Sequence, residues 1–127
     1  MNQGDCFFNK AAQGVPSHLW IIISDPTQNA DDVVIVNLTD ADRYFDQTCV
    51  LDVSDHPGVI SKKSCVAFQL AKITSTAALN AADKAALLFT RPPVPIATLN
   101  KILLAVQTAD ELRNAPKLVL IQQGFIN

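Results

Sequence analysis

Two histidines, His18 and His56, are the side chains of this 127-residue chain best suited to move protons near neutral pH. An imidazole can act as a general base or as a general acid, because it gains or loses its proton in this pH range. Lys62, Lys63 and the hydroxyl of Thr39 could hold a phosphate group through charge or hydrogen bonds. The chain therefore contains a base, an acid and phosphate-binding groups.

Each of these residues also has a purely structural interpretation, and both interpretations stay open. His18 could simply hydrogen-bond a loop carbonyl, and His56, which lies between Asp and Pro, could be a turn residue. Thr39 could be a strand-end hydroxyl. Lys62 and Lys63 could form a solvated turn.

Short strands would position these residues. Apolar runs separated by polar or Pro- and Gly-containing loops predict five strands, at residues 6–8, 18–24, 33–36, 48–51 and 64–73. The unbroken apolar run of the second predicts burial on both faces. Five short strands at this spacing indicate a small, antiparallel β-barrel. His18 would start the second strand, Thr39 would follow the third and His56 would precede the fifth, so we expect them to meet on one rim.

Helices are predicted for the rest of the chain. An alanine-rich stretch predicts a helix over 76–88, for which Asn80 could be the cap, and RPPVP at 91–95 predicts a stiff connector. Ile96, Leu99, Leu103 and Val106 share one helical face. Thr108 with Glu111 predicts a capped helix start, and a short helix is expected at 117–123. We therefore expect one mainly β, α+β domain over 1–127, with a barrel part at 1–75 and a helical part at 76–127.

The composition argues against several classes of protein. With 49% apolar residues the chain should fold, and no apolar stretch approaches the ~18 residues of a membrane helix. The N-terminal residues lack the basic start and apolar block of a signal peptide, so we expect a cytoplasmic protein without membrane contact. Three cysteines in apolar runs should be buried and reduced. No zinc spacing, Walker loop or GxGxxG is present, so neither metal nor cofactor is expected.

Charge is divided unevenly along the chain. Residues 1–56 hold nine Asp against Lys10 and Arg43, whereas residues 57–127 hold eight Lys or Arg against three acidic residues. Any nucleic-acid-binding patch should therefore draw its cations from the later half.

Five segments, GDCFF, SHLWIIISDP, DDVVIVNLTD, QTCVLDVSDHP and SCVAFQLAKI, occur in this order over about residues 4–74. In order and spacing they resemble the MazF/PemK-like toxins of type II toxin–antitoxin systems, in particular a divergent branch with an HLW…SDP strand. The resemblance implies an SH3-like barrel, a homodimer, an antitoxin partner and metal-free cleavage of single-stranded RNA by attack of the ribose 2′-hydroxyl.

The resemblance assigns some residues and leaves others without a match. The family's Thr or Ser after the third strand is matched by Thr39, and its antitoxin-controlled loop is matched in place by residues 10–17. Leu19 stands where the family carries its catalytic Arg. An RNase would then use His18, Thr39 and His56 for catalysis, with the two His sharing the base and acid roles, and Lys62 and Lys63 for substrate. The alternative is a non-catalytic barrel that binds a protein partner, as a toxin–antitoxin or prophage accessory.

Overall fold

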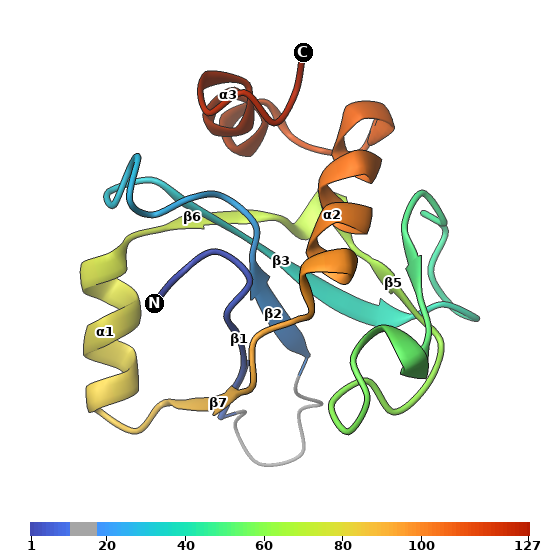
Figure 1. Ribbon diagram of the computed structural model, residues 1–127, viewed down its shortest axis with the longest axis horizontal. Helices are drawn as coiled ribbons and strands as arrows, with labels where there is room; N and C mark the ends of the chain where they lie inside the picture. Colours follow the sequence, from blue (N-terminus) through green and yellow to red (C-terminus); the bar gives the residue numbers. More distant parts are fainter. Residues whose placement is uncertain (11–17) are drawn as a thin grey trace.

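The computed structural model describes residues 1–10 and 18–127 as a sheet with helices on both faces (Figure 1). Most of the predicted antitoxin-controlled loop, at 10–17, lies outside the described residues. The described strands are β1 (Cys6–Asn9), β2 (Leu19–Ile22), β3 (Val33–Asp40), β4 (Val50–Leu51), β5 (Ser64–Val66), β6 (Lys72–Thr74) and β7 (Leu88–Arg91). The helices are α1 (Thr76–Lys84), α2 (Ile96–Ala105) and α3 (Asn114–Gln122).

The described strands pair only in antiparallel fashion, in the order β4-β5-β3-β2-β1-β7, with β6 also paired to β3. The mainly β, α+β class with C-terminal helices is therefore confirmed. The sheet has seven strands rather than about five. Its pairing does not close into a ring within the described residues, where β4 and β7 remain the two ends of the path.

Strand β3 is long enough to serve two partners along one edge. Its first residues pair with β6 and its last with β5, while β2 pairs along the other edge. The prediction of one strand over 64–73 is therefore wrong. A 3-10 turn at Phe68–Leu70 divides that segment, because the chain must step from one part of β3 to the other while Phe68 stays buried.

The two faces of the sheet bury separate cores. Ile21 of β2 packs in the larger core, which also contains Ile102 of α2 and Leu120 of α3. Its neighbour Trp20 packs in the smaller core with Leu79 of α1. This division follows from the alternation of side chains along a strand. Burial of the second strand on both faces is thereby confirmed, and α1 lies away from α2 and α3 in Figure 1.

The helix boundaries differ from those predicted. The cap of α1 is Ser75, whose Oγ accepts a hydrogen bond from the backbone N–H of Ala78 at 3.0 Å, and not Asn80. The helix ends at Lys84, and residues 88–91 instead form β7, which pairs with β1. In α2, Ile102 is buried, whereas Ile96 at the start of the predicted apolar face is exposed.

Among the described residues no α-helix starts at Thr108, and the short helix expected at 117–123 begins earlier than predicted. Thr108 ends a 3-10 turn, Val106–Thr108, and α3 starts at Asn114. Pro116 lies in the first turn of α3, where its missing N–H costs no hydrogen bond. No helix of the described residues is long and apolar enough to cross a membrane.

Candidate functional site

A hollow of about 360 Å³ opens where β2 begins, β3 ends and β5 begins. These strand ends meet because β3 is the antiparallel neighbour of both others: Trp20 pairs with Asn37, and Asp40 pairs with Ser64. The polar side chains of its lining come from His18, Thr39, Asp40, Arg43, Lys62 and from Ser61 and Ser64. Three of the five predicted site residues, His18, Thr39 and Lys62, therefore share one hollow.

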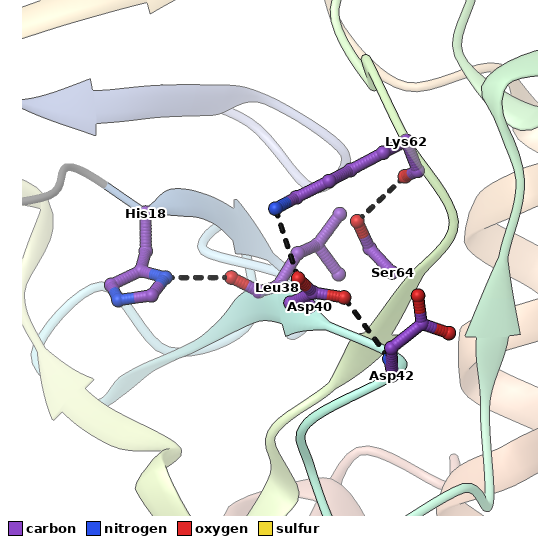
Figure 2. A network of polar contacts seen from close by, with 6 residues as sticks. All are labelled: His18, Leu38, Asp40, Asp42, Lys62 and Ser64. Carbon is purple, nitrogen blue, oxygen red and sulfur yellow. Dashed lines mark hydrogen bonds and ion pairs between the residues drawn. The ribbon is translucent and has the colours of Figure 1, made fainter.

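The ring of His18 is oriented by the backbone of β3. Its Nδ1 lies 3.0 Å from the carbonyl oxygen of Leu38 (Figure 2). A carbonyl can only accept, so Nδ1 carries the hydrogen and donates it. In the neutral ring, Nε2 is then the atom that can take a proton. The carbonyl bond foreseen for His18 is thus present, to a strand rather than a loop, and it fixes the tautomer that a general base requires.

Lys62 reaches across the end of β3 to Asp40. The ammonium nitrogen lies 3.0 Å from Oδ2 of Asp40, and Oδ1 accepts a hydrogen bond from the backbone N–H of Asp42, also at 3.0 Å (Figure 2). The Asp42 N–H first, and then the Lys62 ammonium, lower the pKa of the Asp40 carboxyl, so this carboxylate stays charged. The hydroxyl of Ser64 donates to the carbonyl of Lys62 at 2.9 Å and fixes its backbone.

Arg43 supplies a second cation to the hollow. Its backbone N–H donates to the carbonyl of Asp40 at 3.1 Å, which folds the chain back beside the end of β3. Its guanidinium makes no ion pair with any described residue. Arg43 and Lys62 outnumber Asp40, so the hollow favours a negatively charged group. Neither Arg43 nor Asp40 was predicted as a site residue, although both follow closely after Thr39 in the sequence.

His56 and Lys63 lie outside this hollow. The side chain of His56 is only 5% exposed, and its Nε2 lies 2.7 Å from the carbonyl oxygen of Pro92. The Cys6 thiol donates to the same carbonyl at 3.1 Å. His56 therefore joins the loop before Lys62 to the Pro-rich connector, and the structure does not bring it beside His18. Lys63 is exposed and is not part of the lining.

The position that resembles the family's catalytic Arg carries no charge. Leu19 is the first residue of β2, is buried and forms part of the apolar wall of the hollow. The positive charge of the hollow comes instead from Arg43, which follows β3, and from Lys62, which precedes β5.

The cysteines are free and buried, as predicted. Burial raises the pKa of the Cys6 and Cys49 thiols to about 11, so neither is a nucleophile at neutral pH. Within residues 1–10 and 18–127, no group of three or more His, Cys, Asp or Glu side chains is placed to hold a metal ion.

No family model matches the sequence, and no curated protein matches it either. A match exists among solved structures: an endoribonuclease in complex with its cognate antitoxin, from a mycobacterial species. The two chains are 22% identical and superpose with a TM-score of 0.53, over 90% of this chain and 96% of the other. The chain shares the fold of that endoribonuclease. The likeness spans both the sheet and the helical part, so residues 1–127 correspond to nearly the whole of the matched chain.

Proposed function

We propose that the chain is a MazF/PemK-like endoribonuclease toxin that cleaves single-stranded RNA without a metal ion. The observation that carries the proposal is the hollow at the end of β3, which His18, Thr39, Arg43 and Lys62 line together and in which the imidazole of His18 is oriented. The shared fold with an endoribonuclease supports it, as does the order of sequence segments from 4 to 74.

His18 is the general base in this proposal. Its Nε2 takes the proton of a ribose 2′-hydroxyl, because Nδ1 already donates to Leu38. The freed oxygen forms a bond to the adjacent phosphorus, and the bond from phosphorus to the 5′-oxygen breaks. The products are a 2′,3′-cyclic phosphate and a 5′-hydroxyl.

Arg43 and Lys62 provide the remaining catalytic groups in this proposal. Arg43 and Lys62 stabilise the extra negative charge that develops on the phosphoryl oxygens, and the Thr39 hydroxyl donates one neutral hydrogen bond to them. The leaving 5′-oxygen takes its proton from the Lys62 ammonium. Asp40 holds that ammonium at 3.0 Å and keeps it in the hollow before substrate binds.

Partners are proposed on the same basis. Single-stranded RNA is the substrate, an antitoxin protein is the regulator, and the setting is the cytoplasm. Exposed apolar side chains on α2 and α3, namely Ile96, Leu104, Leu118 and Ile121, support a homodimer, since so many on one small domain call for a covering surface. Completion of the open strand path to an SH3-like barrel belongs to this proposal as well.

A second candidate is a non-catalytic module that binds a protein partner. It is favoured by one observation, the buried Leu19 at the position where the family carries its Arg. The two candidates differ in a direct assay, because only the first produces new RNA ends.

The test is single-turnover cleavage of a labelled, mixed-sequence single-stranded RNA, with protein in excess and a chelator present. We expect fragments ending in 2′,3′-cyclic phosphate, and no cleavage of the all-deoxy strand, which lacks the attacking hydroxyl. Lys62→Ala should slow cleavage roughly 10²- to 10⁴-fold, the scale of losing a general acid.

Lys63→Ala is the matched control, because Lys63 is the neighbouring exposed lysine that does not line the hollow. Its rate should stay within about twofold of wild type. Equal losses in the two variants, or cleavage of the all-deoxy strand, would contradict the proposed site. No cleavage by wild type of any RNA offered would favour the partner-binding module.

A further inference from the structure

We propose that Phe45, supported by Tyr44, is a stacking platform for an RNA base next to the phosphate held in the hollow. The inference rests on the proposed function and names a specificity-determining surface for it. The phenyl ring of Phe45 is 64% exposed, and it lies in a polar loop rather than on a helix or sheet face.

Tyr44 fixes the platform from its inner side. The two ring centroids lie 4.8 Å apart with an angle of 36° between the planes. The Tyr44 hydroxyl is buried and has no hydrogen-bond partner among the described residues, so packing alone holds the inner ring, while the outer ring faces solvent. Burial raises the pKa of Tyr44 above its ordinary value. An anchored pair of aromatic rings leaves one flat face available to a base.

The loop around this pair is held by side-chain hydrogen bonds. The Gln47 amide donates to the carbonyls of Ala41 at 2.9 Å and Tyr44 at 2.7 Å. Oδ1 of Asp46 accepts from both the backbone N–H and the hydroxyl of Thr48, at 3.0 and 2.6 Å. The backbone that carries Phe45 is therefore ordered before any ligand arrives, which lowers the entropic cost of binding.

The platform lies within reach of the hollow. Phe45 is two residues from Arg43, so their Cα atoms cannot be more than about 7 Å apart. Arg43 itself lines the hollow. Exposed aromatic rings and cations together bind single-stranded nucleic acids, in which the bases stack and the phosphates pair with charge. The chain places Phe45 two residues after Arg43 of the hollow, so a base on the ring and a phosphate in the hollow can belong to one RNA strand.

The first experiment measures binding by fluorescence anisotropy of a short single-stranded RNA in which every ribose is 2′-O-methylated, so that it cannot be cleaved. Phe45→Ala should weaken binding roughly 5- to 150-fold, the loss typical of one base stack. Phe45→Trp should retain binding, and its new exposed indole should be quenched by RNA. Phe89→Ala is the matched control. Phe89 is also about half exposed, and the guanidinium carbon of Arg91 lies 5.6 Å from the centroid of its ring.

The second experiment separates stacking from a general effect of the loop. In the same oligomer, one base at a time is replaced by an abasic site. One such replacement should weaken binding to wild type but leave the affinity of Phe45→Ala unchanged, because that variant already lacks the stack.

The outcomes separate the two proposals. If wild type binds RNA and Phe45→Ala binds it as well as Phe89→Ala does, the stacking proposal is wrong and the proposed nuclease function stands. If wild type binds no RNA, both are wrong. If Phe45→Ala instead weakens capture of a protein partner with no RNA binding, the platform is a protein contact and the inference is overturned.

Discussion

Replacing His18 tests the core of the proposed chemistry. His18→Gln is the informative change, because the Gln amide can still donate a hydrogen bond to the Leu38 carbonyl but cannot accept the proton of a 2′-hydroxyl. The ring is exposed at the rim, so the substitution should alter the free energy of unfolding by no more than about 0.5 kcal/mol. Any large loss of rate is then a loss of chemistry rather than of fold.

The expected magnitude follows from the role. A positioned general base contributes about 10²- to 10⁴-fold to the rate, which corresponds to about 3–5 kcal/mol of barrier. Single-turnover cleavage by His18→Gln should fall by that factor.

The assay is the same single-turnover reaction with chelator, with thermal unfolding measured in parallel. A His18→Gln rate within threefold of wild type, at unchanged stability, would remove His18 from the mechanism.

Three further predictions concern the structure around the site. His56→Ala should lower the free energy of unfolding by about 1–3 kcal/mol, because a buried side chain and its hydrogen bond to the Pro92 carbonyl are lost, while the cleavage rate should stay within about threefold of wild type; a loss of rate as large as that of His18→Gln would return His56 to catalysis. Ile102→Ala should cost about 2–5 kcal/mol in chemical denaturation and Ile96→Ala less than about 0.5, since the first side chain is fully buried and the second is exposed. Burial raises the pKa of the Cys6 thiol from 9.0 to about 11, so its contribution to the free energy of unfolding is complete below pH 9 and should fade between pH 9 and 11. Rapid labelling of this thiol in the folded protein at pH 8 would contradict its burial.

Much of the strand layout was predictable because its signals are local. The run at 18–24 is apolar at every inner position, and β2 is buried throughout. The β-branched run at 33–36 lies inside β3, which extends further, to Asp40. The extension was missed because Asn37, Thr39 and Asp40 are polar, and their extended conformation is set by pairing with β2 and β5 rather than by their own preference.

Other boundaries depend on tertiary contacts that no local pattern reveals. Phe68, the first residue of the 3-10 turn, and Ala71, which follows the turn, are both buried, so the apolar pattern of 64–73 is the same whether or not the strand is broken. Leu88 was assigned to a helix because it follows an alanine-rich stretch. It belongs to β7 because β1 offers a free edge there. Helix propensity alone could not predict that strand pairing.

The candidate site was predictable in part, for a geometric reason. His18 precedes one strand and Thr39 ends its antiparallel neighbour, so these two had to lie at the same end of the sheet. Lys62 precedes the strand on the other side of β3 and reaches the same end. His56 lies only six positions earlier than Lys62, but the loop between them turns inward, and a hydrogen bond to Pro92 holds its ring in the interior. Where a loop side chain lies depends on such tertiary contacts, which residue spacing does not predict.

The arrangement also accounts for how this chain can share its fold with an endoribonuclease at 22% identity while Leu stands where an Arg was expected. The fold is maintained by side chains along the interior of β2 and β3, such as Ile21 and Val36, which are fully buried. The polar groups lie on the rim, where His18 and Lys62 are exposed and contribute little to stability. A cation can therefore be lost from the start of β2 and be supplied from beyond the end of β3 by Arg43, without any change to the core. In the proposed chemistry the rim must preserve a base and positive charge on either side of one phosphate, and three neighbouring strand ends offer several positions for each.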